Sequence, residues 1–491
     1  MDEINNNQLS LRQRFLGAGF WVAGSQVFLS VFGMGVTVVL ARLLMPEDYG
    51  LLAMAMIFIG LLNQTNVVGL GHALVRMEKI TAESEELTFS YALIAALALY
   101  MAVYMVAPLT GTFFQEPRVV ALLRVMSLGF VLRAFYIVPY SLLRREFKMK
   151  QQSMIQILGT MADAFSTMAL ALLGFGVWAL AMGPLVSHCV QAVGMAMVRP
   201  WHMGLRMRGE ESRELIRFAG GVNVSILLWY WYVSADSIFI GRVLGGAALG
   251  TFSMAMNLSK LSWNKLWLAL NPILLPLFAE AKEKPGELGR VFLRVTHWVA
   301  LLIFPATFGF MVVAPEAVTV LLSDRWAGAI VPLQWLCLLG SSRALVVLMS
   351  PVILAVGNVR LEVLFNLACG VLLPLGFWLA LPYGIGAVAA VWALLFPVIA
   401  ATVLLRAVLR AVELTLVSYL RTLRTPVLAG LVMALVILGL DALVDVHQGW
   451  LLAGKIVLGA ASYLALVTLL EGNPYRELRR LLADTRAGAR R

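Results

Sequence analysis

Six lysine and arginine residues lie inside long apolar stretches of this sequence, where a charged side chain is costly. They are Arg124, Arg133, Lys260, Lys265, Arg343 and Lys455. A charge at the centre of a lipid bilayer costs roughly 2.5–3.5 kcal/mol, so it must face a watery cavity, a partner or a substrate. Lys455 lies near the end of the last apolar stretch, and we expect it to extend to the membrane surface as an anchor. The other five are candidate contacts for an anion.

Two interpretations compete for Arg124, which lies near one end of its apolar stretch. It can extend to the membrane surface or face a cavity, and the sequence leaves both open. Arg133 and Arg343 lie deeper and occur at related places in the two halves of the chain. This recurrence favours cavity positions for both.

Amide side chains accompany Lys260 at helical spacing. Asn257, Lys260 and Asn264 follow one another at intervals of three and four residues, and Asn271 comes seven residues later, which predicts one polar helical face beside Lys265. Such a face can hold an anion and bind hydroxyl groups. Together with aromatic rings, amides suit a sugar, which has apolar faces and polar edges. The amides that we assign to this role are Gln64, Asn223, Asn257 and Asn264.

Three acids share the apolar stretches: Asp163, Asp236 and Glu362. Asp163 could couple to an ion or a proton, or could simply bond to the hydroxyl side chains around it. Asp236 could do the same or pair with Arg242. The chain has no nucleotide-binding motif, no metal-ligand pattern and no catalytic motif that we recognise, so we predict no cofactor, no bound metal and no enzymatic activity.

The composition predicts an all-α integral membrane protein. Hydrophobic residues make up 61% of the 491 residues, charged residues 13%, and the mean hydropathy is +0.86. A soluble chain of this length needs more polar surface, whereas lipid-facing helices need almost none. At about 20 residues per crossing, the sequence predicts fourteen spans: 18–40, 50–72, 87–111, 119–142, 154–174, 177–198, 216–240, 248–275, 294–314, 329–355, 361–381, 384–405, 425–445 and 449–470.

The basic residues predict the orientation of these spans. Loops on the side of the N-terminus hold 28 of the 38 lysine and arginine residues, and loops on the other side hold four. Cytoplasmic loops carry such an excess, so we expect both termini in the cytoplasm. The formal net charge of +11 then reflects orientation, and we expect no nucleic-acid partner.

An internal repeat predicts the domain organisation. Residues 41–56 and 241–256 share six identities at an offset of 200 residues, among them Arg42/Arg242 and Gly50/Gly250. We interpret the two arginines as residues that fix helix ends. Each copy follows the first of six spans, which predicts two six-helix lobes as parallel repeats plus two C-terminal helices. The predicted segments are a cytoplasmic tail (1–16), an N-lobe (17–198), a basic cytoplasmic linker (199–215), a C-lobe (216–405), a basic loop with the last two helices (406–470) and a basic cytoplasmic tail (471–491).

Four short segments resemble motifs of a known family. Residues 41–50 read ARLLMPEDYG, residues 143–147 LRREF, residues 176–180 GVWAL and residues 245–256 GGAALGTFSMAM. They are similar to signatures of the Wzx-type polysaccharide flippases, in the multidrug/oligosaccharidyl-lipid/polysaccharide exporter superfamily. Phe252 stands where tyrosine is common in that family.

The resemblance implies a function. Such a flippase moves an oligosaccharide linked to undecaprenyl diphosphate from the cytoplasmic to the periplasmic leaflet of a bacterial inner membrane, by alternating access of two lobes around a cationic central cavity. The implied partners are this lipid-linked oligosaccharide, membrane lipids and polysaccharide polymerase or export machinery. The residues that would contact the diphosphate are Lys260, Arg343, Arg133, Lys265 and Arg124.

Two alternatives stay open. One is a cation-coupled multidrug exporter of the same superfamily, a class that favours an acidic cavity, whereas here five intramembrane cations stand against three acids. The other is a scaffold that transports nothing, or a partner in a cell-envelope complex such as that of a peptidoglycan-precursor flippase.

Overall fold

A computed structural model gives the architecture of the chain. It describes residues 24–26, 28–64, 71, 74, 75, 77, 80–207, 224–443 and 448–471, and these form helices joined by short segments, with no strand among them. The predicted all-α character is confirmed. The N-terminal tail (1–16) and nearly all of the C-terminal tail (471–491) lie outside the described residues.

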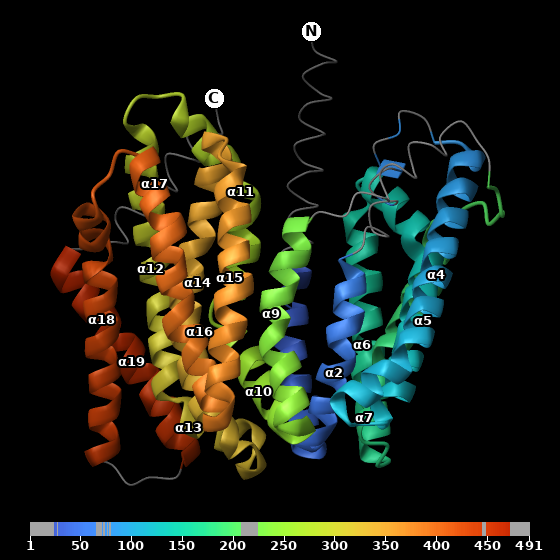
Figure 1. Cartoon of the computed structure of the whole chain (residues 1–491), viewed down its shortest axis with the longest axis horizontal. Coiled ribbons are helices and arrows are strands. Elements are labelled where there is room, and N and C mark those ends of the chain that lie inside the picture. Colours follow the sequence, from blue (N-terminus) through green and yellow to red (C-terminus); the bar gives the residue numbers. More distant parts are fainter. Residues whose placement is uncertain are drawn as a thin grey trace. The chain divides into compact units, whose positions relative to one another are not determined.

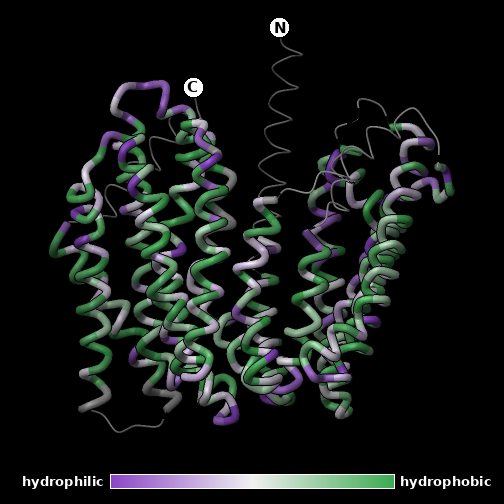
Figure 2. Tube along the Cα trace, viewed as in Figure 1, coloured by the Kyte–Doolittle hydropathy of each residue, from purple (hydrophilic) through white to green (hydrophobic). Residues whose placement is uncertain are grey.

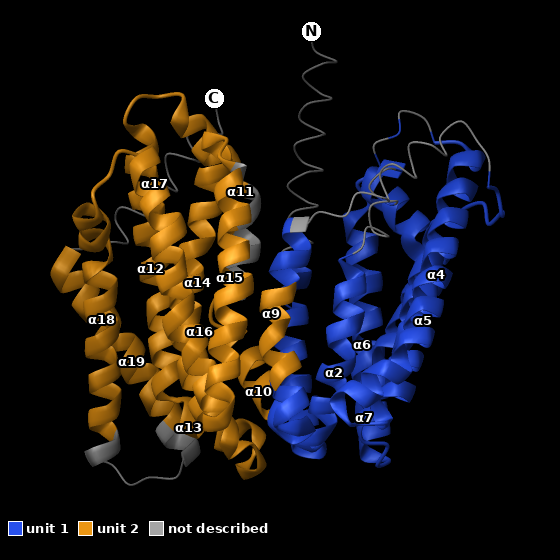
Figure 3. Cartoon of the chain, viewed as in Figure 1, with its two compact units in different colours: residues 1–230, 240–250 blue, residues 231–239, 251–491 orange. Residues whose placement is uncertain are grey.

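The chain divides into two compact units (Figure 3). Unit 1 consists of residues 1–230 and 240–250, and unit 2 of residues 231–239 and 251–491. The predicted lobes 17–198 and 216–405, the linker 199–215 and the segment 406–470 remain predictions.

The helices of each unit run side by side along their length (Figure 1). Unit 1 holds α2 (Pro46–Asn63), α4 (Ala82–Phe114), α5 (Arg118–Arg145), α6 (Met149–Leu172) and α7 (Val177–Val198). It shares α9 (Val224–Val243) and α10 (Gly245–Lys260) with unit 2. Unit 2 also holds α11 (Asn264–Lys282), α12 (Glu287–Val312), α13 (Ala314–Ala317), α14 (Ile330–Val356), α15 (Val359–Ala380), α16 (Ile385–Ala400), α17 (Arg406–Ala411), α18 (Leu416–Leu443) and α19 (Gln448–Glu471).

Eleven helices in the described part of the chain are long and apolar enough to cross a membrane. Figure 2 shows apolar residues along most of their length. They correspond to eleven predicted spans, so the number fourteen is not confirmed. The other three predicted spans are 50–72 and 216–240, which run partly outside the described residues, and 248–275.

The predicted span 248–275 is two helices. α10 ends at Lys260, residues 261–263 form a turn, and α11 begins at Asn264. In this turn the N–H groups of Leu261 and Trp263 bond to carbonyls three residues earlier, at 3.0 and 3.4 Å, instead of four. The span is therefore not one continuous helix. The polar face through Asn257, Lys260 and Asn264 stays a prediction, because the side chain of Asn264 lies outside the described residues.

Ion pairs tie both ends of α5 to neighbouring elements of unit 1. At its start, Arg118 pairs with Glu47 of α2 and with Glu116. The hydrogen bond from the Arg118 side chain lowers the pKa of the Glu116 carboxyl. At its other end, Glu146 pairs with Lys148 at 2.6 Å and with Arg199, which follows α7, at 2.7 Å. The hydrogen bond from Lys148, with that from Arg199, holds the pKa of the Glu146 carboxyl below its ordinary value. α5 itself packs against α4, α7 and α2, so it is the central positioning element of unit 1.

Candidate functional site

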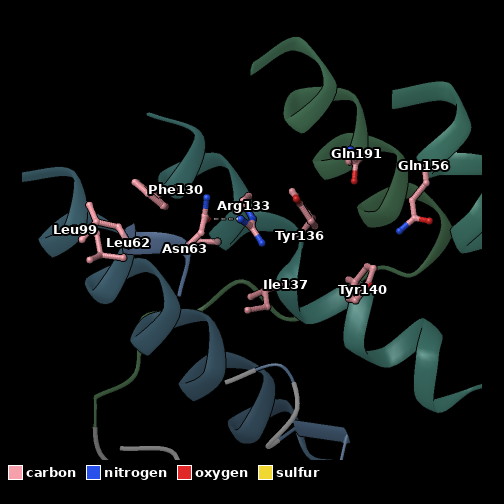
Figure 4. Close-up of a pocket in the computed structure, with 11 residues that line it drawn as sticks. Leu62, Asn63, Leu99, Phe130, Arg133, Tyr136, Ile137, Tyr140, Gln156 and Gln191 are labelled. Carbon is pink, nitrogen blue, oxygen red and sulfur yellow. Dashed lines mark hydrogen bonds between the residues drawn. The ribbon is translucent and has the colours of Figure 1, made fainter. Parts of the chain in front are cut away.

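Arg133 lines a cavity of about 270 Å³ in unit 1 (Figure 4). Its Nη1 donates a hydrogen bond of 2.8 Å to Oδ1 of Asn63, the last residue of α2. The polar residues of the lining are Asn63, Arg133, Tyr136, Tyr140, Gln156 and Gln191, and the apolar ones are Leu62, Leu99, Phe130, Ala134 and Ile137. The structure thus places Arg133 in the lining of a cavity of unit 1, and its contact with a diphosphate stays a prediction.

The helix spacing of α5 explains how these groups come together. Arg133, Tyr136 and Tyr140 follow one another at intervals of three and four residues, so they share one face of α5. Gln156 comes from α6 and Gln191 from α7. At Gly159 of α6 an added methyl group would lie 2.9 Å from Cγ of Gln191. The absence of a side chain at Gly159 therefore leaves space for the Gln191 side chain.

A second cavity, of about 150 Å³, adjoins the first. Asn63, Phe130 and Arg133 line both cavities, and His188 of α7 lines the second. The Tyr136 hydroxyl lies 3.3 Å from Nδ1 of His188. Arg133 therefore stands at the junction of the two cavities. This junction offers a fixed positive charge, amides, and phenol groups in one partly apolar space.

In unit 2, Arg343 of α14 lies among three aromatic rings. Its guanidinium carbon is 4.6 Å from the ring centre of Trp392, and 5.6 Å from those of Trp263 and Phe396. Within the described chain it makes no hydrogen bond or ion pair of its own. Aromatic faces stabilise a guanidinium without using its N–H donors, which stay available for an anion.

Asp236 of α9 is held beside this ring cluster. The indole N–H of Trp392 donates to its Oδ2 at 2.8 Å, and the hydroxyl of Ser237 donates to its Oδ1 at 3.0 Å. Of the two alternatives that the sequence left open for Asp236, the pairing with Arg242 is not formed, and the guanidinium carbon of Arg242 lies 5.7 Å from the ring centre of Phe113. The carboxylate is almost fully buried, and its ion-coupling role stays a prediction.

Asp163 and Arg124 of unit 1 are not among the residues that line the two cavities. Oδ1 of Asp163 accepts a bond of 3.0 Å from Thr167, and a methyl group on Gly183 of α7 would lie 2.2 Å from it. This bond fits the first of the two alternatives for Asp163, in which it bonds to nearby hydroxyl groups. Its coupling to an ion or a proton stays a prediction. The Arg124 guanidinium lies 4.0 Å from the ring centre of Tyr104, and its buried Nε has no partner in the described chain.

The structure describes only some of the predicted amides and of the lysines Lys260 and Lys265. Gln64 is the C-terminal cap residue of α2 and is not among the residues that line the cavity. Its neighbour Asn63 lines the cavity instead. Asn257 is exposed on α10, and Lys260 is the half-buried last residue of that helix. The side chains of Asn264 and Lys265 and all of Asn223 lie outside the described residues.

The expectation that Lys455 extends to the membrane surface is wrong. Its side chain is fully buried, and its ammonium lies 2.5 Å from Oε1 of Glu316 in α13. The Lys455 ammonium therefore pairs with a carboxylate of unit 2 instead of extending to water at the membrane surface.

Five polar residues of the first cavity were absent from the predicted site. They are Asn63, Tyr136, Tyr140, Gln156 and Gln191. The helical spacing from Arg133 to Tyr136 and Tyr140 could have predicted that the two tyrosines share its face. Gln156 and Gln191 come from other helices, so no spacing in the sequence connects them with Arg133.

Comparison with known proteins decides the family. Residues 39–331 match the model of the family described as "Polysaccharide biosynthesis protein". The chain belongs to this polysaccharide biosynthesis family. Its resemblance to the Wzx-type flippases is confirmed, and it is a multi-pass bacterial membrane protein, as predicted.

Relatives in the family align over much of the chain. It is 25% identical over 374 residues to the lipopolysaccharide biosynthesis protein WzxC of Escherichia coli (strain K12), covering 73% of each chain. It is 27% identical over 291 residues, 59% of each chain, to the succinoglycan biosynthesis transport protein ExoT of Rhizobium meliloti (strain 1021). It is 23% identical to the teichuronic acid biosynthesis protein TuaB of Bacillus subtilis (strain 168), covering 82% of this chain and 84% of the relative.

Solved structures share the fold of this family member. The lipid II flippase MurJ in an inward closed conformation matches with a TM-score of 0.73 at 14% identity, over 93% of this chain and 99% of that one. An inward-facing multidrug resistance transporter of the MATE family matches with a TM-score of 0.62 at 18% identity, over 78% of this chain and 94% of that one. At these identities the matches show the fold alone.

Proposed function

We propose that the chain moves a lipid-linked oligosaccharide, carried on undecaprenyl diphosphate, from the cytoplasmic to the periplasmic leaflet of a bacterial inner membrane. The observation that carries the proposal is the cavity of unit 1, where Arg133 stands among amide and phenol groups. Its family membership and the names of its relatives WzxC and ExoT support a role in making or exporting a polysaccharide.

Arg133 is suited to the diphosphate end of such a substrate. A guanidinium keeps its charge at any physiological pH and binds phosphate oxygens with two parallel N–H donors. The bond to Asn63 uses one nitrogen, Nη1, and fixes the plane of the group. The described residues that line this cavity include no carboxylate, which favours an anionic substrate over the cationic drugs of a multidrug exporter.

The rest of the lining suits the glycan. Tyr136 and Tyr140 offer ring faces and hydroxyls, and Gln156 and Gln191 offer amide donors and acceptors. Sugars present apolar faces and polar edges, so this mixture binds them without demanding one particular sugar. In unit 2, Arg343 among its aromatic rings and Lys260 are further candidate contacts for a phosphate group.

Complementation of a deletion strain tests the proposal. We expect Arg133→Gln and Arg343→Gln to reduce polymer export about tenfold or more, because each removes a charge-assisted hydrogen bond to phosphate. Arg133→Lys should retain part of the activity. Arg290→Gln is the matched control, because Arg290 is exposed and, within the described chain, its side chain bonds only to the carbonyl of Gly286.

Membrane levels of every variant are measured beside export. If Arg133→Gln and Arg343→Gln are present at normal levels and export as much polymer as Arg290→Gln, the assignment of the diphosphate contacts is wrong. If the deletion strain accumulates no lipid-linked oligosaccharide, the proposed substrate is wrong.

A further inference from the structure

The segment that follows α7 is bound along the first turns of α4 in unit 1. We call residues 202–207 the strap. The backbone N–H and Nδ1 of His202 each lie 3.0 Å from Oε2 of the buried Glu85. The N–H of Arg206 donates to Oγ of Ser90 at 2.8 Å, and its guanidinium pairs with Glu83 at 3.2 Å.

Two further contacts complete this attachment. At Gly204 an added methyl group would lie 2.5 Å from Cδ of Glu86, and the Gly204 carbonyl accepts from Ser90 at 3.3 Å. The hydroxyl of Tyr91 donates to the carbonyl of Met207 at 2.9 Å. Figure 1 shows the chain after α7 beside the end of α4.

The other side chains of the strap point away from α4. Met203, Leu205 and Met207 are 61%, 78% and 62% exposed, and they alternate with the residues that bind α4. Alternation of this kind is that of an extended segment, in which successive side chains point to opposite sides. A row of three exposed apolar side chains marks a contact site for a partner or a membrane.

The length of α4 places this row at the edge of the membrane. α4 has 33 residues, whereas about 20 cross a hydrocarbon core of about 30 Å. Its exposed apolar side chains run from Ile94 to Phe113, a stretch of about that length. The hydrocarbon then begins near Ile94, and the first turns of α4, which hold the strap, lie at headgroup level.

We propose that the strap is an interfacial membrane anchor whose apolar row inserts into the lipid leaflet. The strap descends along α4 from Glu85 to Tyr91, which is three residues before Ile94. At about 1.5 Å per helical residue, the carbonyl of Met207 is held about one turn from the hydrocarbon. Met207 therefore lies deepest, Leu205 above it and Met203 outermost. The bilayer covers the apolar row and fixes the start of the chain that leads from α7 to α9.

Depth measurement on the full-length protein in vesicles tests this anchor. Single cysteines at 203, 205 and 207 are introduced where Cys189, the exposed native cysteine, is replaced by serine. Each is labelled with an environment-sensitive fluorophore and quenched with phosphatidylcholine spin-labelled at the headgroup or along the chain. Met105→Cys, at a 70% exposed position of α4, is the lipid-facing control, and Lys284→Cys is the aqueous control.

We expect lipid quenching to rise from position 203 to 205 to 207, and the label at 207 to approach the value at 105. Equal quenching at the three positions and at 284 would overturn the proposal. Immobilised labels that neither lipid nor water-soluble quenchers reach would overturn it too, because they indicate a protein partner. The variant Leu205→Gln/Met207→Gln supplies a second measurement, because it removes two of the three apolar side chains. The emission of a label at position 203 should then shift to longer wavelength. An unchanged emission wavelength would contradict the anchor.

Discussion

Gly50 of α2 and Gly250 of α10 each lie against the backbone of the other helix. A methyl group on Gly50 would lie 1.8 Å from the carbonyl oxygen of Gly246, and one on Gly250 would lie 1.7 Å from that of Pro46. Pro46 and Gly246 are also 200 residues apart, so both contacts follow the offset of the sequence repeat. Within unit 1 the two repeated segments therefore meet in a crossing close enough to require glycine.

Substitution of these glycines should destabilise the protein. Gly50→Ala or Gly250→Ala forces a methyl group into a backbone carbonyl, and overpacking of this kind lowers the free energy of unfolding by about 1–3 kcal/mol or more. Gly246→Ala is the matched control on the same helix, because its methyl group would meet its nearest atom at 3.7 Å. Thermal unfolding in detergent measures the difference. Equal melting temperatures for Gly50→Ala and Gly246→Ala would contradict the close crossing.

The bond between Trp392 and Asp236 should contribute to the stability of unit 2. Trp392→Phe keeps a ring near Arg343 but removes the indole N–H, which leaves Oδ2 of the buried Asp236 without this donor. Loss of a partner for a buried polar group costs about 1–3 kcal/mol. Trp378→Phe, at a 57% exposed tryptophan, is the control. A melting temperature like that of the control would show that the bond is not needed.

The buried pair of Lys455 and Glu316 should behave as a unit. Lys455→Met leaves the Glu316 carboxylate with no opposite charge, and breaking a buried pair in this way costs about 3–5 kcal/mol. Adding Glu316→Gln removes the second charge, so the double variant should recover most of the lost stability. A double-mutant cycle measures the coupling. If the double variant is as unstable as the sum of the two single variants, the two residues do not depend on each other.

Sequence reasoning predicted the class of fold well because it rests on local properties. Apolar stretches long enough to cross a bilayer, and helical spacing within them, need no knowledge of which helices are neighbours. Eleven of the predicted spans followed from such properties.

Long-range pairing explains most of what the sequence missed. Glu316 is 139 residues from Lys455, and Asn63 is 70 residues from Arg133, so no spacing rule joins either pair. The interruption at residues 261–263 was missed for another reason: Leu261, Ser262 and Trp263 include neither glycine nor proline, the usual signals of a helix end.

The most direct test of the account is a flipping measurement with purified protein. The lipid-linked oligosaccharide that accumulates in a deletion strain is reconstituted into vesicles with wild-type protein, Arg133→Gln or no protein, and a membrane-impermeant glycan-modifying enzyme reports the fraction in the outer leaflet over time. Wild-type protein should let the enzyme reach glycans that start in the inner leaflet, and Arg133→Gln should do so at least about tenfold more slowly. A wild-type rate equal to that of protein-free vesicles would contradict the central claim.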